Sequence, residues 1–151
     1  MKIKPERIMA TTDFSDSARI GLRLAGSLAG GFGAQLFIIN VIPEKELQWL
    51  TESDLPRKPI DVVAAEQKDR LIQHFNEVLK PEERLGVVPH PVIRFGEPAQ
   101  EIIMASHEMD VDLIVMATHG RTGLRHLLAG SVAEEVIRGA TCPVLTIRPK
   151  E

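Results

Sequence analysis

The sequence predicts an α/β fold in which a parallel sheet of five strands is covered by helices. Short apolar runs rich in β-branched residues recur along the chain, and they have the length of strands buried on both faces. Segments with helical spacing of apolar residues separate these runs, so strands and helices alternate throughout. Such alternation favours parallel pairing through right-handed crossovers. A chain of 151 residues is long enough for one domain with its own core, so residues 1–151 are expected to form a single domain.

Composition and charge exclude several classes of protein. The apolar fraction of 44% and the charged fraction of 26% are those of an ordinary soluble globular protein. A net charge of −3 provides no positive field to recruit nucleic acid. No apolar run approaches the length of a membrane span, and Met1–Arg7 lacks the apolar core of a signal peptide. Cys142 is the only cysteine, which fits a reducing compartment. We therefore expect a cytoplasmic protein with no nucleic-acid or membrane partner.

The first strand is predicted over Arg7–Thr12, and Asp13 follows at its carboxyl end. A helix comes next, because apolar side chains recur at helical spacing beyond this point. Ser15 or Asp16 is expected to cap its start. Gly30-Gly31 is expected to stop it, because glycine is favoured just past helix ends.

The second strand is predicted over Leu36–Val41, a dense apolar run that Pro43 ends. Residues 44–59 are polar and contain two prolines, and the sequence leaves open whether they form a short packed flap or are partly disordered. Helical spacing returns over Ile60–Leu79, and Pro81 breaks that helix.

The third strand is predicted over Val87–Phe95. Two prolines within it place it at a sheet edge, where missing N–H groups are harmless. Gly96-Glu97-Pro98 begins another helix, with the proline near its first position. Leu113–Ala117 is an apolar run that predicts the fourth strand, and Pro143–Arg148 predicts the fifth.

The loop after the fourth strand is the most informative stretch. It is punctuated by Gly120 and Gly123, and Gly130-Ser131 stands directly before a helical pattern that runs to about Arg138. Ser131 is expected to be the N-cap, with Glu134 completing a capping box. Backbone N–H groups at such a helix start attract anions, and glycine lets a phosphate approach the backbone. The spacing is neither that of the P-loop nor that of the dinucleotide fingerprint.

Several blocks of the sequence, in order, resemble the universal stress protein family. The blocks are Ile8–Ser15, Ile39–Val41, Phe95–Pro98 and Asp112–Arg148, so the resemblance extends over nearly the whole chain. ATP-binding members of that family carry Gly-x2-Gly-x9-Gly-Ser/Thr. Gly120, nine further residues and Gly130-Ser131 match its last positions, whereas Ala117 stands where the first glycine is expected.

The resemblance implies a doubly wound, Rossmann-like fold similar to the adenine nucleotide alpha hydrolases, with strand order 3-2-1-4-5. That order agrees with a proline-containing third strand at the edge. It also puts the topological switch point between strands one and four, where open α/β sheets bind ligands. The loops that meet there would be Thr11-Thr12-Asp13 and Ala117–Ser131.

The resemblance further implies that ATP, or AMP or ADP, binds at this point. Asp13 would face the adenosine together with the two threonines, and Val41 would line the base pocket. Gly120, Gly130, Ser131 and Val132 would hold phosphates and ribose. The complete set of candidate binding residues is Thr11, Thr12, Asp13, Val41, Ala117, His119, Gly120, Arg121, Gly123, Gly130, Ser131 and Val132.

Simpler interpretations of these residues stay open. Asp13 could serve only to cap the first helix, and Arg121 could be a solvated loop side chain instead of a partner for polyphosphate. The histidines show no spacing typical of zinc, so a metal site built by protein alone is not expected, whereas Mg²⁺ held mainly by phosphates is compatible with the sequence. No catalytic residue is assigned.

Three functions are compatible with the sequence. The first is a stress-response switch or binding module that binds an adenine nucleotide. The second is a slow ATPase or nucleotide hydrolase, for which His119 is the candidate base. The third is a family member that binds no nucleotide and acts through protein contacts, which Ala117 favours. The family pairs subunits through its last strand, so the apolar run Val144–Ile147 predicts a homodimer.

Overall fold

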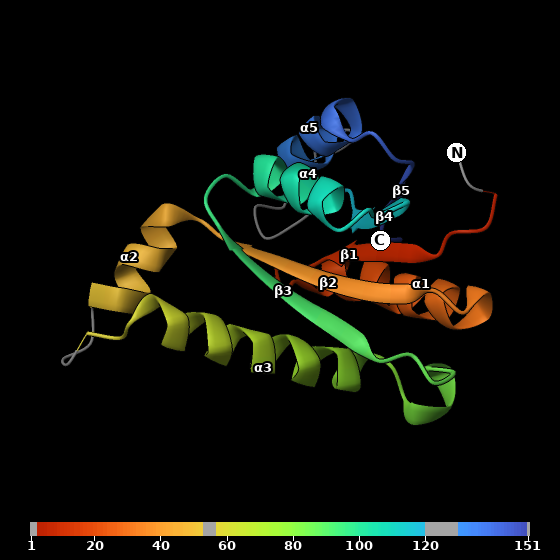
Figure 1. Ribbon diagram of the computed structural model, residues 1–151, viewed down its shortest axis with the longest axis horizontal. Coiled ribbons are helices and arrows are strands. Elements are labelled where there is room, and N and C mark those ends of the chain that lie inside the picture. The colour runs from red at the N-terminus through yellow and green to blue at the C-terminus, as the bar shows by residue number, and fades with distance from the viewer. Residues whose placement is uncertain (1–2, 53–56, 120–129, 151) are drawn as a thin grey trace.

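The computed structural model describes residues 3–52, 57–119 and 130–150, and it contains one parallel sheet of five strands in the order β3-β2-β1-β4-β5 (Figure 1). This confirms the predicted fold class and strand order. The strands are β1 (Arg7–Thr11), β2 (Gln35–Ile42), β3 (Pro89–Phe95), β4 (Leu113–Ala117) and β5 (Val144–Ile147). The α-helices are α1 (Asp16–Phe32), α2 (Glu44–Glu52), α3 (Ile60–Val78), α4 (Pro98–Glu108) and α5 (Ser131–Gly139), and a short 3₁₀ helix spans Pro81–Glu83.

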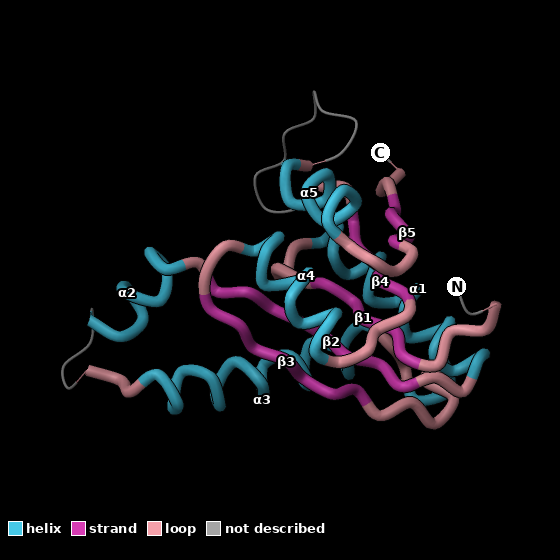
Figure 2. The backbone as a smooth tube through the Cα atoms, turned by 45° about the horizontal axis from the view of Figure 1, so that its top comes forward, coloured by secondary structure: helices cyan, strands magenta, loops and turns pink. Residues whose placement is uncertain are grey.

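β1 is the central strand and pairs in parallel with both β2 and β4. In its register Met9 lies opposite Phe37 on one side and Ile114 on the other. β3 and β5 form the two edges of the sheet (Figure 2). The edge position of β3 accommodates Pro89 and Pro91 within the strand, because the outer side of an edge strand needs no donors.

Helices cover the sheet on both faces, and each face has its own core. α1 and α3 pack on one face, where Ile8 and Ala10 of β1 contribute to the core. α4 and α5 pack on the other face, to which Met9 contributes (Figure 1). Successive strand residues point to opposite faces, and both faces are buried, which is why these strands read as continuous apolar runs.

The prediction that α1 ends at Gly30-Gly31 is wrong. The helix continues to Phe32 and ends at Gly33, whose φ of 66° is the left-handed conformation favoured at a C-cap. Gly30 serves close packing: a Cβ built there would lie 2.8 Å from the Cβ of Leu85. A glycine inside a helix costs only about 1 kcal/mol, so tertiary contacts override its tendency to end the helix.

The structure answers part of the question about residues 44–59. Glu44–Glu52 forms α2, and none of its residues is fully buried. The side of α2 that carries Glu46 contributes to the cavity described below, and Trp49 is 67% exposed. α2 is therefore an appendage beside α3 and not part of either core, and residues 53–56 of this segment lie outside the described residues. Among the described helices, none has both the length and the apolar character needed to cross a bilayer.

Candidate functional site

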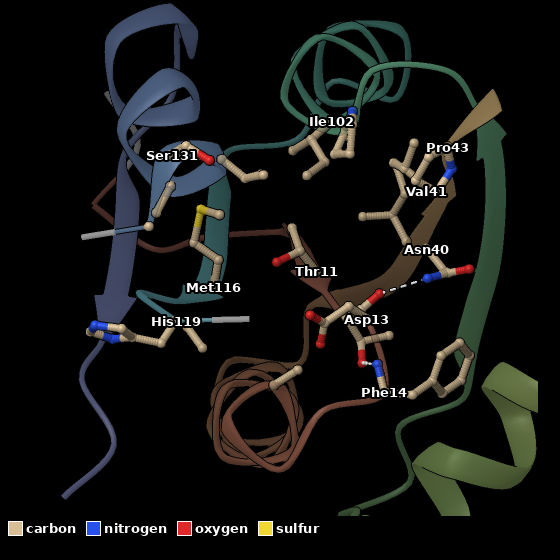
Figure 3. A pocket seen from close by; sticks show the side chains of 18 of the residues that line it. Thr11, Asp13, Phe14, Asn40, Val41, Pro43, Ile102, Met116, His119 and Ser131 are labelled. Carbon is tan, nitrogen blue, oxygen red and sulfur yellow. Dashed lines mark hydrogen bonds between the residues drawn. The ribbon is translucent and has the colours of Figure 1, made fainter. Parts of the chain in front are cut away.

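A cavity of about 280 Å³ opens at the carboxyl ends of the central strands (Figure 3). The helix that follows β1, α1, packs on one face of the sheet, whereas the helix that follows β4, α5, packs on the other face. A crevice therefore forms between the ends of β1 and β4. Candidate residues from the sequence that lie on its wall are Thr11, Thr12, Asp13, Val41, Ala117, His119, Gly130, Ser131 and Val132. The remaining candidates, Gly120, Arg121 and Gly123, lie outside the described residues.

The turn after β1 is held by backbone and side-chain hydrogen bonds. The Thr12 N–H donates to the Ile39 carbonyl at 3.0 Å, and its own carbonyl accepts from the Asn40 side-chain amide at 2.9 Å. The Thr12 hydroxyl oxygen accepts from the Phe14 N–H at 3.0 Å. Both Thr12 and Asn40 are more than nine-tenths buried, so these bonds lie away from solvent and hold the turn firmly.

Asp13 sits at the apex of this turn and lines the cavity. One oxygen of its carboxylate accepts from the Ser15 N–H at 2.9 Å, which closes a local turn. The N-cap of α1 is Ser15, whose hydroxyl accepts from the Ala18 N–H at 3.2 Å. The interpretation of Asp13 as the helix cap is therefore wrong, and its carboxylate stands beside the cavity as an acceptor.

The opposite wall is formed where β4 meets the start of α5. Thr118 donates its N–H to Ile147 of β5 at 2.9 Å, and its hydroxyl lies 2.9 Å from Nδ1 of His119. The Gly130 N–H donates to the Thr118 carbonyl. A Cβ built on Gly130 would lie 2.8 Å from that carbonyl oxygen, closer than real Cβ contacts occur. Glycine is therefore needed at this position for the packing of α5 onto β4, whether or not a ligand is bound.

The predicted capping box at the start of α5 is wrong. The N-cap is Gly130, which has no side chain, and no side chain of the described residues caps the first turn. The contact between Gly130 and Thr118 starts the helix one residue earlier than the sequence suggests, so Ser131 is the first helical residue and is exposed. Within the described part of the chain, the N–H groups of this first turn thus lack a side-chain cap next to the cavity, which is the arrangement that attracts anions.

The two sides of the cavity differ in chemistry. Figure 3 shows Met116, His119 and Ser131 on one side, Val41, Pro43 and Asn40 on the other, and Thr11 and Asp13 between them. Apart from Asn40, the second side is an apolar slot that Val41 and Pro43 form together with Ile39 and Ile102. A flat apolar group fits such a slot. A group with hydroxyls can donate hydrogen bonds to the Asp13 carboxylate, and an anion can bind at the start of α5.

Sequence reasoning missed the residues that α2, α3 and α4 contribute. These are Glu46, Gln67, Arg70, Pro98 and Ile102, which lie on the cavity wall but carry no local signal of a site. The Arg70 guanidinium lies 3.9 Å from the centre of the Phe14 ring, a cation–π contact that joins α3 to the turn after β1. A polar asparagine within the apolar run of β2 was the one signal that could have pointed to Asn40. No group of three or more His, Cys, Asp or Glu side chains among the described residues is arranged to hold a metal ion.

Comparisons with known proteins agree on one family. The profile of the Universal stress protein family matches residues 5–148. Universal stress protein MJ0531 of Methanocaldococcus jannaschii is 34% identical over 147 residues, which cover 97% of this chain and 84% of that protein. Universal stress protein MJ0577 of the same organism is 28% identical over 160 residues and covers 99% of each chain.

Solved structures share the fold. A structure of protein MJ0577 matches with a TM-score of 0.76 at 27% identity and covers 99% of both chains. Two structures under 25% identical contain ligands. A universal stress protein in complex with cAMP has a TM-score of 0.63 at 20% identity and covers 95% of this chain and 97% of that one. The protein from Archaeoglobus fulgidus in complex with dAMP has a TM-score of 0.61 at 22% identity and covers 97% and 99%.

Proposed function

We propose, from the premise that this chain belongs to the universal stress protein family, that it binds an adenine nucleotide, ATP or AMP, in the cavity between β1 and β4. In this proposal the protein is a cytoplasmic binding module or switch in a stress response. The base occupies the apolar slot beside Val41, the ribose hydroxyls meet the Asp13 carboxylate, and the phosphates lie against the start of α5.

One observation carries the proposal: three chemically different surfaces converge on a single cavity. The apolar slot comes from β2 and α4, the carboxylate from the turn after β1, and the uncapped N–H groups from α5. A nucleotide has an apolar base, a sugar with hydroxyl groups and an anionic phosphate in the same sequence. The fit of these three parts to one site favours a nucleotide over a ligand that is purely apolar or purely anionic.

The ligands of two proteins of the same fold support the choice of adenine. One holds cAMP and the other dAMP, and both compounds are adenine nucleotides with a single phosphate. A monophosphate would use the start of α5 alone. A triphosphate would extend farther and bring Mg²⁺ with it, held mainly by the phosphates because the described side chains form no metal cluster.

Titration calorimetry with AMP, ADP and ATP tests this function, with GMP as the comparison ligand. Asp13→Asn is expected to weaken adenine-nucleotide binding by about tenfold to about a hundredfold, because a charge-assisted hydrogen bond contributes about 1.5–3 kcal/mol. Asp16→Asn is the matched control, since Asp16 is an exposed acid in the first turn of α1 and does not line the cavity. The absence of saturable binding by every adenine nucleotide would overturn the proposal.

Slow hydrolysis of the bound nucleotide is the second candidate function. His119 lines the cavity, and the contact of its Nδ1 with the Thr118 hydroxyl holds the ring in one orientation. An oriented imidazole near a phosphate can act as a general base toward water. Steady ATP turnover that disappears in His119→Ala while binding persists would favour this function. Equal turnover in both proteins would exclude His119 as the base.

The proposal includes a homodimer in which two copies pair through β5. β5 has β4 on one side and is the last strand of the sheet on the other. The carbonyls of Pro143 and Ile147 accept hydrogen bonds from the β4 side. Because bonding direction alternates along a strand, the backbone groups of Val144 and Thr146 point to the open edge. Leu145 is 38% exposed, which leaves an apolar side chain on this edge strand.

A further inference from the structure

A buried histidine lies behind the wall of the nucleotide cavity. His74 is on α3, is only 7% exposed, and packs edge-on against the Phe14 ring with 5.1 Å between ring centres. Its Nε2 atom is buried and has no hydrogen-bond partner in the part of the chain that the structure describes. A neutral imidazole tolerates one unpartnered nitrogen, whereas an imidazolium carries an N–H donor on both nitrogens. The site therefore suits the neutral form of His74.

Phe14 connects this histidine to the cavity. It follows Asp13 directly, and its φ of 65° is left-handed, a conformation that costs energy for any residue other than glycine. Packing must maintain it: the Phe14 ring contacts His74 and lies under the Arg70 guanidinium at 3.9 Å. Figure 3 shows the Phe14 side chain extending from the Asp13 turn toward α3. Loss of the contact with His74 would let the turn relax and displace the Asp13 carboxylate.

The charges around His74 come from three elements. Burial is the main cause that lowers its pKa below 6.5, and Arg19 on α1 and Arg70 on α3 act in the same direction. Glu77 on α3 and Asp13 in the turn act in the opposite direction. The net effect keeps His74 neutral while it is buried, so protonation favours states in which this ring has left its position.

We propose that His74 is a positioning residue for the nucleotide site, which in its neutral form supports Phe14 and Asp13 and on protonation releases them, so that nucleotide affinity falls in acid. This inference rests on the proposed nucleotide binding and adds a regulatory input to it. The acting signal is proton concentration, and the element that responds is the turn Thr12–Phe14.

The direction and size of the effect follow from linkage. The binding-competent state holds His74 neutral, and a released histidine titrates near 6.5. Affinity is therefore full above this value and declines as the pH falls below it. At about one pH unit below 6.5, protonated His74 outnumbers neutral His74 about tenfold in the released state. Affinity therefore weakens by up to about tenfold near pH 5.5.

The experiment is the dissociation constant of AMP for the full chain, measured between about pH 7.5 and about pH 5.5. His74→Phe keeps a ring against Phe14 but cannot be protonated, so its profile should lack the acid weakening seen in the native protein. His74→Leu is the second variant if the phenylalanine does not fit. Titration of AMP itself is common to the native protein and its variants, so the difference from the native profile isolates His74.

Two charge variants give a readout that a merely structural role would not move. Arg19→Gln removes a repelling cation and so raises the pKa of buried His74 toward that of the released ring, which should make the loss of affinity in acid smaller than in the native protein. Glu77→Gln removes an attracting anion and lowers this pKa further, which should make the loss of affinity in acid larger. Neither residue lines the cavity.

The outcomes separate the two proposals. A smaller acid loss of affinity in Arg19→Gln and a larger one in Glu77→Gln, together with a flat His74→Phe profile, support the role of His74. Binding at neutral pH with identical profiles in native protein and His74 variants overturns this inference and leaves the proposed function standing. Charge variants that both leave the profile unmoved would overturn it as well. Failure of AMP, ADP and ATP to bind at neutral pH overturns the proposed function first.

Discussion

The side-chain amide of Asn40 donates a hydrogen bond to the main-chain carbonyl of Thr12 at 2.9 Å, and this bond ties β2 to the turn that follows β1. The two residues are 28 positions apart, and both are buried. The bond places Asp13, the next residue along the chain, at the mouth of the cavity. A polar residue within an apolar strand thus holds the segment that we expect to contact the ribose.

Asn40→Ala should destabilise the protein and weaken nucleotide binding together. The buried Thr12 carbonyl would lose its side-chain donor, at a cost of about 1–3 kcal/mol in the free energy of unfolding. Gln35→Ala is the matched control, because Gln35 is an exposed amide on the same strand. Urea denaturation and calorimetry with AMP measure the two effects. A variant as stable as the control would show that the bond does not hold the turn.

Gly130→Ala should weaken nucleotide binding and lower the melting temperature. The new Cβ would meet the Thr118 carbonyl oxygen at 2.8 Å and push the start of α5 away from β4. Overpacking of this kind costs about 1–3 kcal/mol. Gly31→Ala is the control, since nothing lies within 4 Å of a Cβ there and alanine favours the α1 helix. Equal melting temperatures for the two variants would contradict the packing argument.

Ala117→Gly should leave nucleotide affinity within about a factor of two. By the alternation of side chains along β4, Ala117 points to the same face as Val115, which packs with α1 and α3. The methyl group is then directed away from the helix start that receives the phosphate. A large gain in affinity would instead show that the alanine obstructs the ligand, and it would favour a native role through protein contacts.

Leu145→Lys should convert a dimer into a monomer. A charge on the outer edge strand opposes strand pairing between copies. Val88→Lys adds the same charge beside β3 at the opposite edge, where Val88 is 73% exposed, and it should leave the dimer intact. Sedimentation velocity at micromolar concentration distinguishes the states. A native protein that already sediments as a monomer would refute pairing through β5.

Stability should fall as the pH is lowered below about 6.5, and His74→Phe should reduce this dependence. Burial lowers the pKa of His74 in the folded protein, so the unfolded chain binds more protons between the two pKa values. The contribution of His74 is therefore full above 6.5, declines below it and levels off below the folded-state pKa. Urea midpoints at several pH values test this without any ligand, and parallel curves for both proteins would contradict it.

Much of the architecture could be predicted from the sequence because it depends on local patterns. Apolar runs of strand length alternate with helical spacing, and this is enough to predict a parallel α/β sheet. The strand order came from the resemblance to a family and not from any spacing within the chain. Thr11–Asp13 lies at the carboxyl end of β1, and Gly130–Val132 lies at the start of α5, the helix that follows β4. The carboxyl ends of these two neighbouring strands share one edge of the sheet, so the meeting of the two segments in one cavity follows from the topology.

Contacts between distant residues decided the rest. α1 continues through Gly30, against which Leu85 packs, and α5 begins at Ser131, with Gly130 as its N-cap beside the Thr118 carbonyl. The contacts of Phe14 with Arg70 and His74 join segments more than 50 residues apart. Local sequence determines which elements can form and where polar residues can stand. Only the packed chain determines which side chains meet, because burial and steric contact depend on residues that are far apart in the sequence.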